Sequence, residues 1–396
     1  MNARLSGTEQ EGYNGRVTDW KKIRKDFQVT ETCAYFQSAG MSPLPRPVFE
    51  AIKAGYERLF REGDIHWPDD MDRYRALCRR LAGMLNAGPD DVTFAPNSST
   101  AMGILGLSLK ERIEPPFHIV SMQDEFPAST VAFEYLGIPM RYVQPRAGRY
   151  PLSAVLDMTD KQTAAVITSF VQYATGFRQD LLTLGRELNK RGILLGVNAT
   201  QGFPYYPIDV RAMGIDALTA SLHKWGLTGH VGALFYTSAA FRERFPPPLA
   251  GWLSIDSPAG EGIPIAKNVP FKLFDSARRY EMGTFNLILL LALSAALDYM
   301  ESIGFELIRL RLKELTDALI AGLKSLGISI VSPVVREEER SAIVSFTLGD
   351  RNGECVKMLE DKKVYVSLRA GLVRISVNIF NDVNDIDRLL AALKSR

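Results

Sequence analysis

Short apolar segments alternate with longer amphipathic segments between Pro43 and Tyr236. The short segments are rich in β-branched and aromatic residues, which favours strands. We expect strands at 92–95, 118–122, 164–170, 193–197, 217–220 and 232–236. Strands that alternate with helices predict a mostly parallel, doubly wound sheet with helices on both faces.

The segment 74–86 shows the helical period well. Leu77, Leu81 and Leu85 recur every four residues, and arginines occupy the positions between them. One apolar stripe on an otherwise charged helix is typical of ordinary packing against a sheet. A second helix is expected at 181–191.

The pattern changes after residue 244. The stretch 244–275 is rich in Pro and Gly, which predicts a long, partly extended excursion. Two helices then follow, and after them the pattern favours a smaller β-containing unit. These helices are expected at 287–304 and 306–326, and the strands at 328–331, 341–347, 365–368 and 372–377.

These elements predict an α/β protein with a large domain at 36–290 and a smaller α+β domain at 291–396. From its position, the N-terminal segment 1–35 is expected to pack on the small domain. A chain of 396 residues is long enough for two domains.

Composition narrows the classes of protein. Lys and Arg number 47 against 45 Asp and Glu, so the net charge of +2 disfavours nucleic-acid binding. Three cysteines without a CxxC pair and four histidines supply neither a disulfide framework nor a metal cluster. The apolar run 287–297 is too short for a membrane span, and the first residues lack an apolar leader. We expect a cytoplasmic enzyme with no metal.

Nucleotide-binding signatures are absent from the sequence, since it contains neither GxGxxG nor GxxxxGK[ST]. The densest group of chemistry-bearing residues lies between Gly196 and Tyr236 instead. It reads Asn198-Ala199-Thr200-Gln201, Gly202, Pro207-Ile208-Asp209-Val210, Gly214-Ile215-Asp216 and Ser221-Leu222-His223-Lys224. This order resembles the class V aminotransferase family of pyridoxal-phosphate (PLP) enzymes, which includes cysteine desulfurases, selenocysteine lyases, kynureninases and isopenicillin N epimerases.

The resemblance implies the PLP-dependent transferase fold type I and assigns Lys224 as the catalytic residue. An aldehyde cofactor is held as a Schiff base by an amine that can lose its proton. The freed amine of Lys224 would then move the proton at the substrate Cα.

Other residues match positions that bind PLP in the family. Asn97, Ser98, Ser99 and Thr100 follow a predicted strand and open a predicted helix, where backbone N–H groups and hydroxyls suit a phosphate. The resemblance implies that Ser98, Ser99 and Thr100 bind the phosphate, and it adds Ser221 and His223. It implies that Gln201 contacts the phenolic oxygen of the cofactor.

An aromatic side chain is expected to stack on the cofactor ring. The resemblance implies that Phe126 is this residue, at a position where desulfurases carry a histidine. A phenylalanine cannot move protons, so the acid-base work falls on Lys224. Tyr173 resembles the residue beside the cofactor hydroxyl, and a half-buried loop tyrosine without function fits it equally well.

Arginine suits the carboxylate of an α-amino-acid substrate. Arg374 lies in an otherwise apolar strand, and the family's arginine at this place binds the substrate carboxylate; Arg369 is a second cation of the site. The stretch 279–284 matches a family motif whose Gly283 and Thr284 reach the phosphate of the neighbouring subunit. The resemblance therefore implies a homodimer with sites at the interface.

Two departures bear on the reaction. Asn198 stands where the family has an aspartate that stabilises the protonated pyridine nitrogen, and a neutral amide offers no such charge. No cysteine lies between Arg369 and Leu372, where a persulfide-forming desulfurase needs one, and Cys355 falls in a predicted helix as a buried thiol.

We therefore expect β-elimination, with cleavage of a C–S or other Cβ–X bond and no persulfide cysteine. An aminotransferase or an epimerase is the alternative, and a non-catalytic PLP-binding scaffold is the third possibility. The side chain of the substrate is not predicted.

Overall fold

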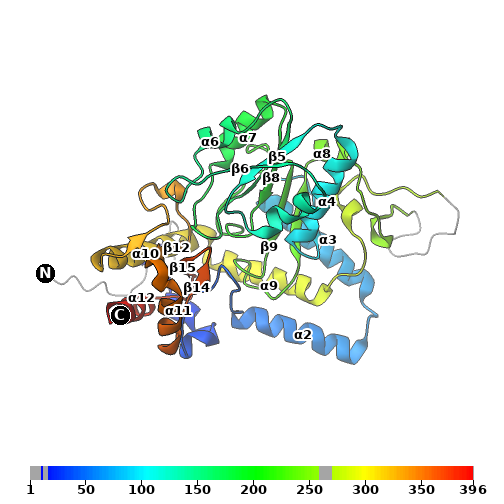
Figure 1. The fold of residues 1–396 in the computed structure, drawn as a ribbon. Helices are drawn as coiled ribbons and strands as arrows, with labels where there is room; N and C mark the ends of the chain where they lie inside the picture. Colours follow the sequence, from blue (N-terminus) through cyan, green and yellow to red (C-terminus); the bar gives the residue numbers. More distant parts are fainter. Residues whose placement is uncertain (1–9, 12–16, 258–269, 396) are drawn as a thin grey trace.

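The computed structural model describes residues 10–11, 17–257 and 270–395. Its main feature is a seven-stranded sheet of order β4-β10-β9-β8-β7-β5-β6 (Figure 1). Strand β10 runs antiparallel to β4 and β9, and the other paired strands are parallel. The predicted mostly parallel sheet is confirmed. The strands are β4 (Val92–Ala95), β5 (His118–Met122), β6 (Met140–Val143), β7 (Thr163–Ser169), β8 (Leu194–Asn198), β9 (Ala217–Ser221) and β10 (Ala233–Thr237).

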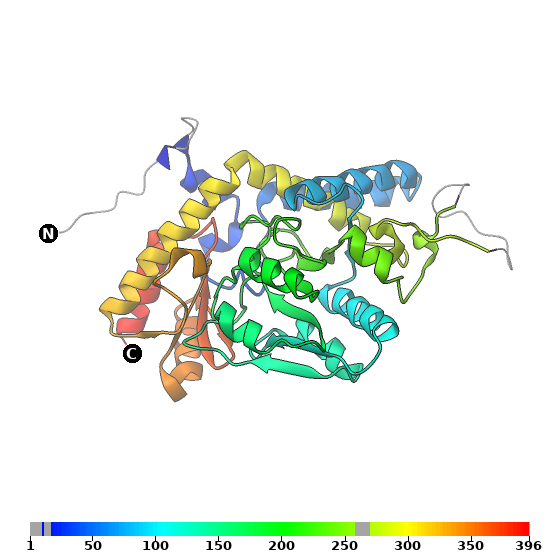
Figure 2. The same ribbon diagram turned by 90° about the horizontal axis from the view of Figure 1, so that it is seen from above.

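Successive residues of each strand enter separate cores on the two faces of the sheet. Ile119 and Ile167 belong to one apolar cluster, and their neighbours Val120 and Val166 belong to the other. Side chains alternate between the faces of a strand, so the strands need helices on both sides. Figure 2 shows these helices around the sheet. They are α3 (Trp67–Met84), α4 (Ser98–Arg112), α5 (Val131–Tyr135), α6 (Leu152–Asp157), α7 (Leu181–Lys190) and α8 (Ala239–Arg244).

A smaller unit follows two consecutive helices, α9 (Leu287–Ile303) and α10 (Phe305–Ser325). The chain turns by 75° between them. Gly304 joins them with a φ of +97°, which favours glycine. Within the part of the chain that the structure describes, no single helix is long and apolar enough to cross a membrane, although these two pass that test as a bent pair.

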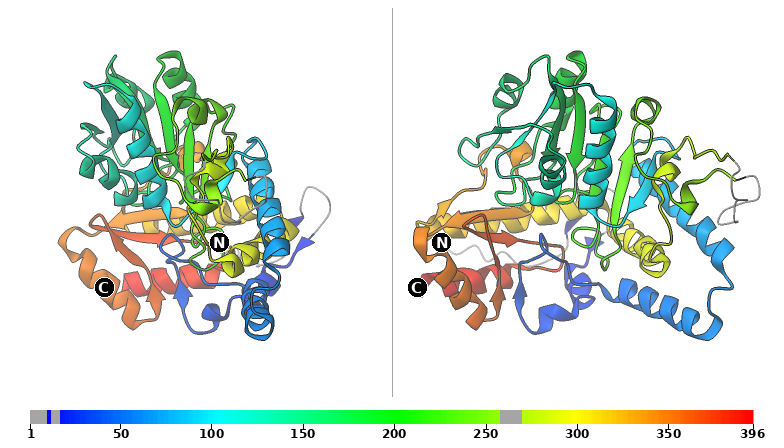
Figure 3. Two further views of the ribbon diagram at one scale, coloured as in Figure 1. Left: turned by 90° about the vertical axis from the view of Figure 1, so that its right-hand side faces the viewer. Right: turned by 45° about the vertical axis from the view of Figure 1, so that its right-hand side comes forward.

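The smaller unit contains an antiparallel sheet of order β11-β12-β15-β14 (Figure 3). Predicted strand 365–368 is in fact divided between two sheets, because β13 pairs with β3 near the N-terminus and not with β14. The elements are β11 (Ser329–Ile330), β12 (Ile343–Thr347), α11 (Asn352–Asp361), β13 (Val364–Tyr365), β14 (Ser367–Arg369), β15 (Leu372–Ser376) and α12 (Val383–Lys394).

The described part of the N-terminal segment contacts this smaller unit. Strand β3 (Ala34–Tyr35) pairs with β13, and Arg24 of α1 (Trp20–Lys25) forms an ion pair of 2.7 Å with Asp385. Strands β1 (Gln10–Glu11) and β2 (Val17–Thr18) pair with each other, and α2 (Arg46–Glu62) follows β3. The boundaries 36–290 and 291–396 stay predictions. Residues 1–9 and 12–16 of the predicted N-terminal segment, and 258–269 of the predicted excursion, lie outside the described residues.

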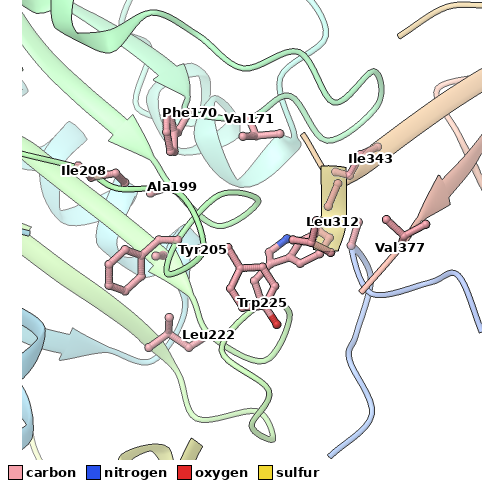
Figure 4. Packing of buried hydrophobic residues seen from close by; sticks show 14 of the residues in the cluster. Phe170, Val171, Ala199, Tyr205, Ile208, Leu222, Trp225, Leu312, Ile343 and Val377 are labelled. Carbon is pink, nitrogen blue, oxygen red and sulfur yellow. The ribbon is translucent and has the colours of Figure 1, made fainter. Parts of the chain in front are cut away.

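Aromatic packing joins the large sheet to the smaller unit (Figure 4). Tyr205 and Trp225 lie in edge contact, and the Tyr205 hydroxyl donates to Asn378 Oδ1 at 2.9 Å. Trp225 is 1% exposed and donates from Nε1 to Gln201. Burial of an aromatic side chain of this size stabilises a fold by about 4 to 6 kcal/mol. This packing holds the turn that carries the neighbouring residue, Lys224.

Candidate active site

A cavity of about 320 Å³ opens between the large sheet and the β14–β15 hairpin. Carboxyl ends of parallel strands are the usual place for a site in such sheets. Among the predicted site residues, those that line this cavity are Ser98, Ser99, Phe126, Tyr173, Asn198, Gln201, Ser221, His223, Lys224, Arg369 and Arg374. The structure therefore brings together most of the predicted set.

Lys224 projects into the cavity from the turn after β9. Its Nζ lies 5.3 Å from the centre of the Phe126 ring. Burial, with smaller contributions from the nearby Arg374 and Arg369, lowers the pKa of Lys224 to about 8. Near pH 7 the amine is therefore neutral far more often than that of an ordinary lysine, and the neutral form can attack a carbonyl carbon.

The N-terminus of α4 forms another part of the wall. Asn97 caps this 15-residue helix by accepting a hydrogen bond from the Thr100 backbone N–H at 2.9 Å. Ser98 lies 2.8 Å from Ser221, hydroxyl to hydroxyl. Hydroxyls at a helix N-terminus favour an anion with several oxygens. Beside them, burial, Lys224 and His230 lower the pKa of His223 to about 4, so its imidazole is neutral at pH 7.

Three predicted cofactor residues lie elsewhere. Thr100, Gly283 and Thr284 line a second cavity of about 450 Å³. The Thr100 hydroxyl donates to Asn97 Oδ1 at 3.2 Å, and Asn97 itself lines the cavity of Lys224. Within one chain these three residues do not line the cavity of Lys224. The role predicted for Gly283 and Thr284 depends on a partner subunit, and the phosphate contact predicted for Thr100 stays a prediction.

Arg374 is a buried cation beside Lys224. It is 1% exposed, its Nη1 donates to the Tyr173 carbonyl at 2.8 Å, and its Nε has no hydrogen-bond partner among the described residues. Burial, and then repulsion from Arg369, lowers the pKa of Arg374 to about 10. A buried guanidinium with unused donors favours a carboxylate ligand.

Arg369 faces the cavity from the same side of the hairpin. It pairs with Leu372, two residues before Arg374, so both arginines lie on one face of the sheet. Among the described residues that line the cavity there is no Asp or Glu. The site is therefore positively charged and has no internal counter-ion in its wall.

Phe126 and Tyr173 form the aromatic side of the cavity. Their ring centres are 5.3 Å apart in an edge contact, and Phe126 is 41% exposed. Burial raises the pKa of Tyr173, so its hydroxyl stays protonated. Phe126 leaves part of its ring accessible to a flat ligand, on a ring over which Lys224 Nζ also lies.

The side-chain amides of Asn198 and Gln201 are already hydrogen-bonded. Asn198 Oδ1 accepts from the Thr200 backbone N–H at 3.1 Å, and Nδ2 donates to Ser129 Oγ at 3.0 Å. Gln201 Nε2 donates to the Ala39 carbonyl at 2.9 Å, and one further hydrogen remains for a ligand.

Sequence reasoning missed several residues of the wall. Ser169 lies opposite Asn198 across β7 and β8, and Gly40 lies beside Arg374, where an added Cβ would be 4.0 Å from Nη2, an ordinary contact distance. Behind Ser169, the buried carboxylate of Glu125 accepts hydrogen bonds from the Ser169 N–H and hydroxyl and from Gln172. For Glu125 the only signal was its place beside Phe126, and for Gly40 there was none.

The turn between β14 and β15 has only two residues. Ala370 and Gly371 have φ of +48° and +73° and connect the paired residues Arg369 and Leu372. Two positive φ values in succession are typical of the tightest hairpins, which leave no room for a loop. All three cysteines of the chain are described and buried, and none lines the cavity.

The wall fits the cofactor expected from the sequence. It combines an amine with a lowered pKa, an anion site at a helix N-terminus, a partly exposed aromatic ring and a buried guanidinium whose Nε has no partner among the described residues. These groups match an aldehyde, a phosphate, a pyridine ring and a substrate carboxylate. Over 10–11, 17–257 and 270–395, no group of three His, Cys, Asp or Glu side chains is placed to hold a metal.

Comparison with known proteins also supports a class V aminotransferase fold. The model of the family Aminotransferase class-V matches residues 34–389. A probable cysteine desulfurase of Pyrococcus abyssi is 25% identical, with 94% of this chain and 96% of that protein aligned.

Solved structures share the fold. The apo cysteine desulfurase of Thermococcus onnurineus NA1 has a TM-score of 0.84 at 22% identity, covering 95% of this chain and 97% of that one. The cystine C–S lyase C-DES, solved with cysteine persulfide, has a TM-score of 0.81 at 21% identity, covering 93% and 99%. Because the family model spans most of the sequence, this chain belongs to the class V aminotransferase family and is a pyridoxal-phosphate enzyme.

Proposed function

We propose that the enzyme is a lyase that cleaves a Cβ–S or other Cβ–X bond of an α-amino acid without passing sulfur to a protein cysteine. The observation that carries this proposal is the two-residue turn Ala370-Gly371, together with the burial of every cysteine. A persulfide would need an accessible thiolate near the substrate. The similarity to a structure described as a cystine C–S lyase adds support.

Each wall residue has a role in this reaction. When bound as a Schiff base, PLP withdraws electrons from the substrate Cα. The N-terminus of α4, with Ser98 and Ser99, holds the phosphate, and Arg374 binds the substrate carboxylate. The Lys224 amine would hold the cofactor through its aldehyde and would take the proton from the substrate Cα. Phe126 covers the ring and exchanges no proton.

The overall reaction balances without an acceptor. The leaving sulfur takes the electron pair of the Cβ–S bond and ends as a thiol or persulfide. The rest of a cysteine-type substrate, with one water, becomes pyruvate and ammonia. An aminotransferase would instead consume a keto acid, and an epimerase would release neither product.

A panel of β-substituted amino acids, assayed with and without a keto-acid acceptor, tests the proposal. We expect pyruvate and ammonia in equal amounts without an acceptor. The same yield is expected from the Cys33→Ala, Cys78→Ala, Cys355→Ala triple variant. Conversion only with an acceptor would establish an aminotransferase. Inversion at Cα would establish an epimerase. No conversion, with the cofactor bound, would establish a non-catalytic scaffold.

The proposal includes a cytoplasmic homodimer with sites at the interface. Thr100, Gly283 and Thr284 gather at the second cavity, and Phe49 and Phe60 of α2 expose apolar rings. Three free thiols suit a reducing compartment. Light scattering of the purified protein should give twice the mass of one chain, and a monomer that turns over substrate would contradict the shared site.

A further inference from the structure

The amide of Asn198 occupies the cavity wall at the end of β8. The side chain is 5% exposed, and both ends of its amide have partners: the Thr200 backbone N–H and the Ser129 hydroxyl. Ser129 is fully buried at the end of the short 3-10 turn η2 (Pro127–Ser129), directly after Phe126 and within the loop that forms the aromatic side.

These two partners determine which way the amide faces. A backbone N–H can only donate, so the group opposite Thr200 must be the oxygen of Asn198. A flipped amide would set two donors against each other and leave a buried N–H unsatisfied, at a cost of about 1 to 3 kcal/mol. The NH₂ group is therefore on the Ser129 side, with one hydrogen used by Ser129 and one remaining.

The charges around the cavity also disfavour a positive charge on a bound ligand. The ionisable side chains at its wall are His223, Lys224, Arg369, Arg374 and the phenol of Tyr173, so its charged groups are cations. The carboxylate of Glu125 does not line the cavity, and its hydrogen bonds go to Ser169 and Gln172. A further positive charge on a ligand ring would be repelled by the wall cations and would have no carboxylate in contact.

Building on the proposed function, we propose that Asn198 donates its remaining N–H to an unprotonated pyridine nitrogen of PLP, and that Ser129 and the Thr200 backbone are the positioning groups. An unprotonated ring withdraws electrons more weakly. This weaker withdrawal slows transamination more than it slows reactions in which an electron pair leaves with a substituent at Cβ. The inference thus names the feature of the site that separates elimination from amino transfer.

The test is the ¹⁵N NMR signal of PLP labelled at the ring nitrogen and bound to the apoprotein. We expect the wild-type signal in the range of an unprotonated pyridine at pH 7. In Asn198→Asp the signal should move to the pyridinium range. The aspartate can accept from the Thr200 N–H, and the Ser129 hydroxyl can rotate to donate, so the pocket accommodates the change.

Two control variants separate position from charge. Asn97→Asp adds the same charge elsewhere in the wall and keeps the α4 cap, since aspartate caps as well as asparagine. Its ring signal should stay at the wild-type position, although the added charge weakens phosphate binding. Ser129→Ala removes one positioning group and leaves the Thr200 N–H in place, so the nitrogen should remain unprotonated.

The outcomes are distinct from those that test the proposed function. Absorbance of bound cofactor shows independently whether PLP is held. A protonated ring in the wild-type protein, with cofactor bound, would overturn the role of Asn198 and leave the lyase proposal standing. A signal in Asn198→Asp identical to wild type would overturn it as well. Failure of PLP to bind would defeat the proposed function itself.

Discussion

Two buried charges in this molecule have opposite surroundings. Glu281 is fully buried, and its carboxylate accepts hydrogen bonds from Arg75, Tyr74 and Thr93. Arg374 is almost as buried, yet among the described residues its guanidinium donates to the backbone carbonyl of Tyr173 and has no carboxylate partner. Breaking a buried ion pair destabilises the fold, whereas a buried cation that lacks a counter-ion and faces a cavity is available to bind an anionic ligand.

The difference separates residues that lie in similar sequence motifs. Glu281 belongs to the stretch 279–284 that resembles a family motif, and its contacts join α3 to the turn η4 (Ala277–Tyr280). Arg374 also belongs to a stretch that resembles a family motif, and its neighbours are Lys224 and Arg369. We infer a structural role for Glu281 and a binding role for Arg374.

The largest effect is expected from replacing Lys224, at the centre of the cavity that Arg374 lines. Lys224→Ala should abolish covalent capture of PLP, because no other amine lines the cavity among the described residues. Borohydride reduction followed by mass spectrometry measures the capture. Lys190→Ala, an exposed lysine on α7, is the control and should retain it. A reduced adduct in Lys224→Ala would disprove the site.

Glu281→Gln tests the structural side of the comparison. Removing one partner of a buried pair costs about 3 to 5 kcal/mol, because Arg75 keeps its charge without its carboxylate. Urea unfolding should show this loss in the free energy of unfolding, while PLP capture at saturating cofactor persists. Glu306→Gln, at an exposed position, should change it by less than about 0.5 kcal/mol. Equal stability of both variants would contradict the structural role.

Arg374→Gln should have the opposite effects: it should weaken substrate binding and leave the stability of the fold unchanged. A charge-assisted hydrogen bond contributes about 1.5 to 3 kcal/mol, so KM for an α-amino acid should rise about 10- to 100-fold. The melting temperature should not fall, because the variant no longer buries an unpaired cation. Steady-state kinetics and calorimetry measure the two quantities. A large loss of stability with unchanged KM would show that Arg374, like Glu281, has a structural role.

The smallest effect concerns pH. The neutral amine attacks PLP, so the rate of capture should rise with pH and reach half its maximum near pH 8, the lowered pKa of Lys224. Arg369 contributes to that lowering, so Arg369→Gln should shift the midpoint to higher pH. Stopped-flow absorbance follows the rate. A midpoint near that of an ordinary lysine would show that the wall does not act on the amine.

Much of the site could be predicted because it lies in local patterns. Lys224, Ser221 and His223 are contiguous, and α4 begins where the sequence places a cap and hydroxyls. Gly40 and Ser169 escaped prediction, because their roles depend on approach to residues distant in the sequence. The family resemblance groups Thr100 with Ser98 and Ser99, and in the structure Thr100, one helical step further along α4, lines the second cavity.

The sequence by itself determined the alternation of strands and helices, the family motifs and the absence of a cysteine beside Arg369. Each of these depends on local periodicity or on residue identity. Only the tertiary structure decided which buried charges are satisfied, which way the amide of Asn198 faces, and that the described residues of the cavity wall include no carboxylate. Those properties come from groups that meet across β7, β8, β9 and the β14–β15 hairpin, and hydrogen bonding and desolvation depend on such contacts in space.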